Sequence, residues 1–92
     1  MKVSITFRHL EPTDALKKYV NEKVGRIQRY LPNPADASVV LSTERHLQDC
    51  DVTISGAGKT FNSSESSDDM YASVDRAVDR IEKQVRRAKR TP

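Results

Sequence analysis

Residues 69–90 read DMYASVDRAVDRIEKQVRRAKR, and the apolar residues within them recur at intervals of three and four. That spacing is typical of an amphipathic α-helix, because residues three and four apart lie on the same helical face. The apolar stripe consists of Tyr71, Val74, Val78, Ile81 and Val85. We therefore predict a long helix that buries this stripe and is capped by Ser66, Ser67 or Asp68.

The segments upstream alternate between apolar and polar residues, which indicates strands with one buried face. The predicted strands are residues 2–7 (KVSITF), 36–44 (DASVVLSTE), 50–55 (CDVTIS) and 60–66 (TFNSSES). The last of them is the most polar and follows the turn sequence GAGK.

A second helical pattern separates the first two strands. Apolar residues recur at helical spacing from Leu16 to Leu31, after Thr13 or Asp14 as a possible cap and before the helix-breaking Pro32. Gly25 lies inside this pattern and lowers its intrinsic helix stability.

The order of elements is therefore βαβββα, and we assign residues 1–92 to a single domain of the α+β class. Each strand has one apolar face, so both helices should pack on the same face of a four-stranded sheet and leave the other face in water. The first two strands should run parallel and be joined by a right-handed crossover.

The composition limits the functions open to such a domain. A net charge of +3 and a pI near 9.2 permit an anionic partner without requiring one. No apolar run approaches the roughly 20 residues that span a bilayer, and the N-terminal residues show no signal-peptide pattern, so we expect a cytoplasmic protein. Cys50 is the only cysteine, which excludes a disulfide within the chain, and we interpret it as a buried apolar residue.

The motifs that resemble catalytic or metal sites are incomplete. GAGKT at 56–60 lacks the glycine of a phosphate-binding loop, because Thr53 occupies that position, and a strand follows it where the motif needs a helix. His9 and His46 have no partners at metal-ligand spacing. We therefore predict a protein that is not an enzyme and uses no cofactor or metal.

The polar face of the C-terminal helix separates its charges by sign. On a helical projection, the cations opposite the apolar stripe are Arg76, Arg80, Lys83, Arg87 and Arg90. The acids Asp75, Asp79 and Glu82 gather instead on one flank. A solubilising face usually mixes signs, and like charges three and four residues apart repel unless an anion relieves them.

Two interpretations of this stripe remain. The simpler is an ordinary solvated face, whose last-turn cations also suit the helix dipole. The alternative, which we favour, is a surface for a nucleic-acid backbone, because arginine forks match phosphate oxygens. If the helices lie side by side, the outer cations Lys18, Arg26 and Arg29 of the first should join the stripe in one basic plateau. Such a surface reads shape and charge and not base sequence.

The βαβββα order, the stretch ALKKYVNEKVGRIQRYL at 15–31 and above all DMYASVDRAVDRIEKQVRRAKR resemble the ribosome hibernation-promoting factor family, also called protein Y or ribosome-associated inhibitor. The resemblance covers essentially the whole chain. It implies binding to small-subunit ribosomal RNA during stress or stationary phase, and exclusion of messenger and transfer RNA.

The resemblance also implies contact residues. Family basic positions match Lys23 and Arg26 in the first helix, Arg80, Lys83 and Arg87 with Gln84 in the second, and Arg45 after the second strand. Arg29, Arg76, Arg86 and Arg90 rest on the helical projection, and of these Arg29, Arg76 and Arg90 enter the predicted set. The predicted RNA-binding residues are therefore Lys23, Arg26, Arg29, Arg45, Arg76, Arg80, Lys83, Gln84, Arg87 and Arg90.

Two questions stay open at this point. The chain ends at RAKRTP, so it is expected to be either a short-form factor or the N-terminal domain of a longer one. A general double-stranded RNA-binding module and a protein-interaction module that uses the polar face of the sheet are the alternative functions.

Overall fold

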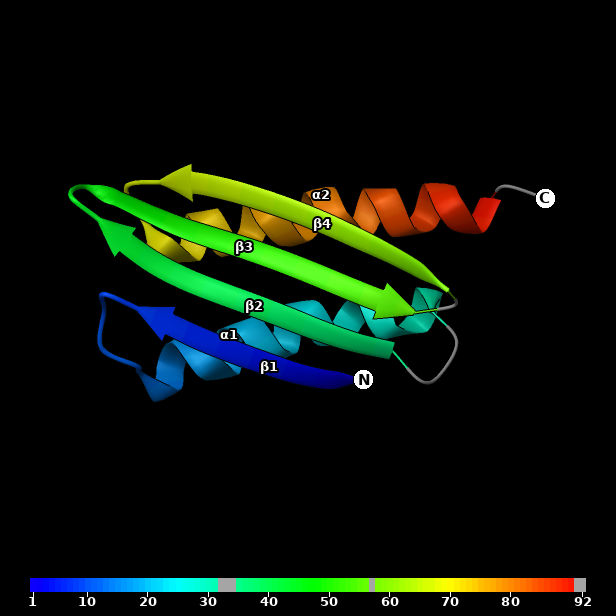
Figure 1. Cartoon of the computed structure of the whole chain (residues 1–92), viewed down its shortest axis with the longest axis horizontal. Helices are drawn as coiled ribbons and strands as arrows, with labels where there is room; N and C mark the ends of the chain where they lie inside the picture. The colour runs from blue at the N-terminus through cyan, green and yellow to red at the C-terminus, as the bar shows by residue number, and fades with distance from the viewer. Residues whose placement is uncertain (32–34, 57, 91–92) are drawn as a thin grey trace.

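The structure, a computed structural model, describes residues 1–31, 35–56 and 58–90 of the 92-residue chain, without the side chains of residues 89 and 90. Its elements follow the predicted βαβββα order (Figure 1). They are β1 (Lys2–Arg8), α1 (Asp14–Gly25), the 3₁₀ helix η1 (Arg26–Tyr30), β2 (Ala35–Glu44), β3 (Leu47–Gly56), β4 (Lys59–Ser67) and α2 (Met70–Arg90).

The four strands form one sheet in the order β1-β2-β3-β4. β1 runs parallel to β2, as predicted, and Ile5 lies opposite Val39. The pairs β2–β3 and β3–β4 are antiparallel. β3 is longer than predicted because Leu47 pairs with Glu44, which leaves only Arg45 and His46 in the connecting turn.

The connection from β1 through α1 to β2 is left-handed, so the predicted right-handed crossover is wrong (Figure 1). In a two-residue turn the two flanking residues, here Glu44 and Leu47, must pair with each other through their backbone hydrogen bonds. The backbone groups of Glu44 therefore determine on which side of β2 the strand β3 lies. β1 can then pair only at the opposite edge of β2. The apolar faces of the strands place α1 on the same side as α2, and these two constraints together fix the hand.

The first helix has two parts. Thr13 caps α1 by accepting a hydrogen bond from the Leu16 N–H at 3.1 Å. α1 ends at Gly25, and the chain then tightens into η1, where the Arg26 N–H bonds the Lys23 carbonyl three residues back. The predicted single helix to Leu31 is therefore an α-helix followed by a 3₁₀ turn, a change that begins at the residue of lowest helix propensity.

The long helix α2 begins one residue later than the predicted caps allow. Asp69 is the cap, because its Oδ1 accepts the Tyr71 N–H at 3.2 Å. Ser67 and Asp68, which we had predicted to fill this role with Ser66, belong to the end of β4 and the turn before the helix. Ser73, fully buried, donates to the Gln48 carbonyl at 2.6 Å and so ties the start of α2 to β3.

The core lies between the sheet and the two helices, which both cover one face (Figure 1). The helices contribute Leu16, Val20, Val24, Ile27, Val74, Val78, Ile81 and Val85, all of them buried. The strands contribute Ala37, Val39, Leu41, Cys50, Val52 and Ile54. Burial raises the pKa of the Cys50 thiol to about 12, with a smaller contribution from Asp51, which fits its predicted role as an apolar residue.

Candidate nucleic-acid interface

The cationic stripe of α2 points away from the sheet. Arg76, Arg80, Lys83 and Arg87 are all exposed, because they lie opposite the buried stripe on the same helix. No carboxylate belongs to this stripe, and its cations extend along several turns of one straight helix. The arrangement suits a polyanion better than a small anion, since only a polyanion can contact the whole row at once.

One edge of the stripe is attached to the sheet. Arg80 forms an ion pair with Glu65 of β4, although 65% of its side chain stays exposed. Gln84, a predicted contact, donates from Nε2 to the Asn62 carbonyl of β4 at 2.9 Å. Both side chains therefore already have partners within the protein, and the β4 side of α2 is the less available edge for a ligand.

The acidic flank of α2 faces α1. Asp75 accepts a hydrogen bond from the Tyr19 hydroxyl at 2.5 Å and lies 3.2 Å from Lys23 Nζ. The Lys23 ammonium also lies 5.7 Å from the centre of the Tyr19 ring. Tyr71 completes the group by packing edge-on against Tyr19, with ring centres 5.0 Å apart. Lys23, a predicted RNA contact, is thus half-buried in a contact between the helices.

The titration of this group follows from its contacts. The hydrogen bond to Asp75, together with burial and the negative charge of that carboxylate, raises the pKa of Tyr19 to about 12. Burial opposes the ionisation of Asp75, but the hydrogen bonds from Tyr19 and Lys23 and the charge of Lys23 outweigh it and lower the pKa of Asp75. At neutral pH the phenol therefore donates to an ionised carboxylate.

The expected single basic plateau is divided. The two helices do lie side by side, but Asp75 stands between their cations, and Asp79 follows one turn later on the same flank. A nucleic-acid backbone that crosses from α2 to α1 near the start of α2 would meet these carboxylates. The helical projection places Asp75 on the acidic flank of α2. Only the packing of the two helices shows that Asp75 faces α1.

The cations of the two helices meet at the other end of the pair. Arg29 of η1 lies over the Tyr30 ring with its Cζ 5.8 Å from the ring centre. Arg86 of α2 lies over the same ring at 5.5 Å. Arg86, named from the helical projection but not included in the predicted RNA-binding set, contacts Tyr30, and this contact depends on helix packing.

The remaining predicted residues are dispersed. Arg26 is exposed at the start of η1, on the same end as Arg29. Arg45 is exposed in the β2–β3 turn with a φ of 57°, at the end of the molecule where α2 begins (Figure 1). It is therefore far from η1 and the last turns of α2. Arg90 ends α2, but its side chain lies outside the described residues.

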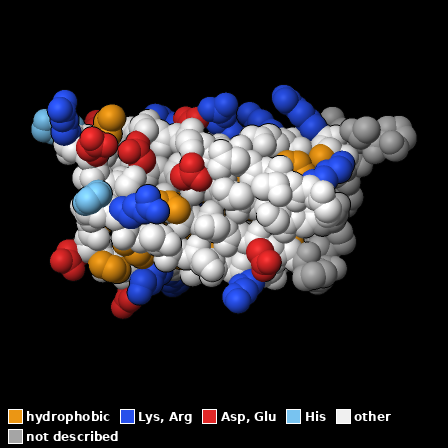
Figure 2. Space-filling model, in the orientation of Figure 1, with side chains coloured by type: hydrophobic (Ala, Val, Ile, Leu, Met, Phe, Trp, Pro, Cys, Tyr) orange, Lys and Arg blue, Asp and Glu red, His pale blue; other side chains and the backbone are white. Residues whose placement is uncertain are grey.

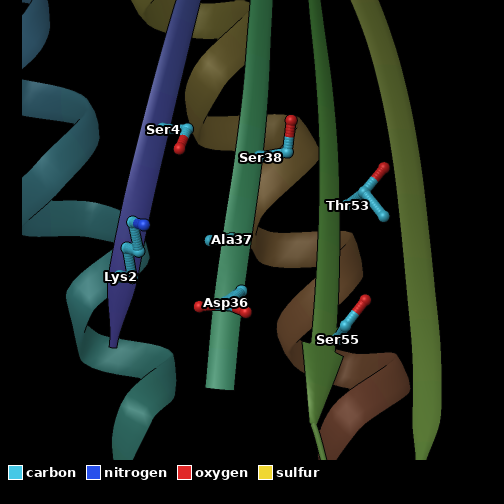
Figure 3. Close-up of a pocket in the computed structure, with 7 residues that line it drawn as sticks. All are labelled: Lys2, Ser4, Asp36, Ala37, Ser38, Thr53 and Ser55. Atoms are coloured by element: carbon cyan, nitrogen blue, oxygen red, sulfur yellow. The ribbon is translucent and has the colours of Figure 1, made fainter. Parts of the chain in front are cut away.

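The opposite face of the sheet has a different chemistry. Figure 2 shows it as mostly uncharged, with cations and acids along its edges and a few of them within the left half of the face. Serine, threonine and asparagine side chains bond across the strands there; Asn62, for example, donates to Asp51 at 3.0 Å and to Thr53 at 2.9 Å. A hollow of about 280 Å³ opens over β1, β2 and β3 (Figure 3). Its lining residues are Lys2, Ser4, Asp36, Ala37, Ser38, Thr53 and Ser55.

This hollow contains no pairing of a nucleophile with a base. Its polar side chains stand on three neighbouring strands and do not converge on one another (Figure 3). Across the described residues, no group of three histidine, cysteine or acidic side chains could hold a metal ion. None of the described helices combines the length and apolar character needed to cross a membrane.

Comparison with solved structures agrees with this architecture. The crystal structure of the N-terminal domain of Thermus thermophilus protein Y is 36% identical and superposes with a TM-score of 0.89, over 96% of this chain and 99% of that one. A ribosomal subunit interface protein from Coxiella burnetii, at 23% identity, has the same fold with a TM-score of 0.86, over 97% and 98% of the two chains.

Sequence comparison gives the family. A ribosome hibernation promoting factor from Acidithiobacillus ferridurans is 36% identical over 78 residues, which cover 82% of this chain and all of the relative. The factor of that name from Azotobacter vinelandii is 31% identical, over 92% of this chain and 79% of its own length. Residues 3–91 match the family described as Sigma 54 modulation protein / S30EA ribosomal protein. The chain therefore belongs to this family, which contains the ribosome hibernation promoting factors.

Proposed function

We propose that this protein is a ribosome hibernation factor that binds small-subunit ribosomal RNA through the exposed cations of α2 and η1. The observation that carries the proposal is the row of Arg76, Lys83 and Arg87 along α2, which contains no acid, in a chain of this family. Phosphate contacts of this kind supply affinity without base specificity, so the shape of the folded RNA would select the target.

The mechanism is capture followed by exclusion. The cations attract the RNA over a distance set by ionic strength, and each phosphate contact releases condensed counterions. The protein then occupies space on the small subunit that messenger and transfer RNA would otherwise use. No bond is made or broken, so the protein acts as a stoichiometric inhibitor of translation in the cytoplasm under stress, and residues 1–92 act as one ribosome-binding domain.

The experiment is co-sedimentation with purified small subunits across a salt series. The test variant carries Arg76→Glu, Lys83→Glu and Arg87→Glu. It avoids Arg80, because a glutamate there would face Glu65 and disturb the fold. A matched control carries Lys2→Glu, Arg8→Glu and Lys59→Glu, which change the net charge equally at exposed positions on strands.

We expect the test variant to lose binding and the control to keep most of it. Single substitutions in the stripe should each lower the log–log salt slope by about one for every phosphate contact removed. Transfer RNA should compete with the wild-type protein. Equal loss in both triple variants would show that net charge alone drives binding, and equal binding to a plain RNA duplex would favour a general double-stranded RNA-binding module.

A further inference from the structure

Tyr30 brings together two arginines from different parts of the chain. Arg29 precedes it in η1, whereas Arg86 lies in the C-terminal half of α2. Their Cζ atoms lie 5.8 Å and 5.5 Å from the centre of the ring, so the distance between them cannot exceed the sum of these two values. Two guanidinium groups are thus held within reach of one short segment of polyanion.

Neither of these arginines has a carboxylate partner among the described residues. The ion pairs described for Lys23 with Asp75 and for Arg80 with Glu65 involve neither of them. Arg29 and Arg86 are exposed and contact the face of an aromatic ring, which attracts a cation without neutralising it. None of the described ion pairs therefore offsets their mutual repulsion.

The ring itself is well anchored. Tyr30 is half-buried and packs against the hydrophobic core, at the point where η1 contacts α2. A guanidinium that rests on a fixed ring has fewer rotamers than one on a free side chain, so it loses less entropy when it binds. This distinguishes Arg29 and Arg86 from cations of the α2 stripe such as Lys83, for which no such support is seen among the described contacts.

We propose that Arg29 and Arg86 form a phosphate clamp for an RNA backbone segment that crosses from η1 to α2, and that Tyr30 is its positioning residue. This inference rests on the proposed function, since it takes the ligand to be RNA. Guanidinium forks can each take two oxygens of a phosphodiester, which fixes the register of the RNA on the protein. The clamp also lies clear of Asp75, where the same helix pair presents a carboxylate.

The test separates the position of the arginines from their charge. Tyr30→Leu removes the ring but keeps an apolar side chain and both arginines, whereas Tyr30→Phe keeps the ring. Tyr71→Leu is the matched control, because Tyr71 is an exposed aromatic of the same helix pair with no arginine over it among the described contacts. Arg86→Ala removes one charge. Affinity for small subunits is measured across a salt series, with thermal denaturation as the check on folding.

We expect Tyr30→Leu to weaken binding by about five- to thirtyfold with an unchanged salt slope, since no charge is lost. Arg86→Ala should weaken binding by about tenfold and lower the slope by about one. Tyr30→Phe and Tyr71→Leu should bind like wild type. Wild-type affinity in a folded Tyr30→Leu variant would overturn the clamp while leaving the proposed function intact.

A second readout does not need the ribosome. The Nε–Hε resonances of Arg29 and Arg86 are followed by NMR while a short single-stranded RNA is added, with polyglutamate as a comparison. We expect both resonances to shift together with RNA, and to shift less in Tyr30→Leu. If they shift while small subunits fail to bind, the proposed function is wrong and the clamp stands; a response to polyglutamate alone would overturn the assignment to RNA.

Discussion

The two ends of the helix pair contain the same kinds of side chain, an aromatic ring and cations, but they differ in what these side chains contact. At the end where α2 begins, Tyr19 and Lys23 of α1 meet Asp75 of α2. At the other end, Tyr30 of η1 meets Arg29 and Arg86. Both ends pair an aromatic ring with cations, but among the described contacts only the first includes a carboxylate.

That single difference separates a structural contact from a binding site. A cation beside a carboxylate is satisfied within the protein, so its charge contributes to helix docking and is less available to a ligand. Cations on a neutral ring keep their charge available, and the fold holds them together despite their repulsion. The position of acids around a basic surface is therefore as informative about its ligand as the position of the cations.

The largest effect is expected from a substitution that unfolds the domain and so destroys the contacts at both ends of the helix pair. Val78 lies between them in α2 with 4% of its surface exposed, so Val78→Asp would bury a charge without a partner. We expect loss of the cooperative thermal transition, since the cost of several kcal/mol approaches the stability of a small domain. Arg76→Asp introduces the same residue on the exposed face and should remain folded by circular dichroism.

An effect of intermediate size is expected from a substitution that removes the Asp75 carboxylate at the first end, so that Lys23 loses its described ion pair. Asp75→Asn removes the carboxylate that holds Lys23, so it should lower the free energy of unfolding by about 0.5–1 kcal/mol. The released Lys23 should raise the affinity for small subunits severalfold and steepen the salt slope by up to about one. Asp79→Asn is the matched control. It makes the same change in net charge, but Asp79 belongs to neither of the two described ion pairs.

Equal gains in binding from both variants would show that the acids act only through net charge. Chemical denaturation and the salt series, measured on the same preparations, give the two quantities needed. The proposed difference between the ends holds only if Asp75→Asn lowers the free energy of unfolding and raises the affinity for small subunits, while Asp79→Asn changes neither in this way.

The smallest effect concerns the titration of Tyr19. Its pKa of about 12 lies above the ordinary value of about 10, so the folded state favours the protonated phenol. The stability this provides is complete below about pH 10 and is lost as the pH rises towards 12. In Asp75→Asn the pKa should fall towards 10, as followed by the Tyr19 ring carbon resonances in NMR; an unchanged value would mean that burial alone sets it.

Much of the fold could be predicted because each element carries a local signal. Alternation indicated all four strands, and spacings of three and four residues indicated both helices. The errors occurred where a non-local constraint prevailed. The hand of the first crossover depends on the turn between β2 and β3, and the residues after Gly25, in η1, pack against α2.

The candidate site was less predictable for the same reason. The stripe on α2 lies on one helix, so the projection placed Arg76 and Lys83 on an exposed face correctly. Which neighbour each flank faces is a property of the assembled pair, and so the partnership of Lys23 with Asp75 could not be derived from spacing. The contact of Arg86 with Tyr30 could not be derived from spacing either, because the two residues lie far apart in the sequence.

The edge position of β1 has a consequence for the order in which the chain is assembled. β1 leaves the ribosome before β2, β3 and β4 during synthesis, yet Lys2 pairs with Asp36 and so has no partner until β2 has been made. The hairpins of β2, β3 and β4 close over much shorter loops and lose less chain entropy. β1 is therefore expected to join the sheet late, and until it does its apolar residues Val3, Ile5 and Phe7 are open to a chaperone.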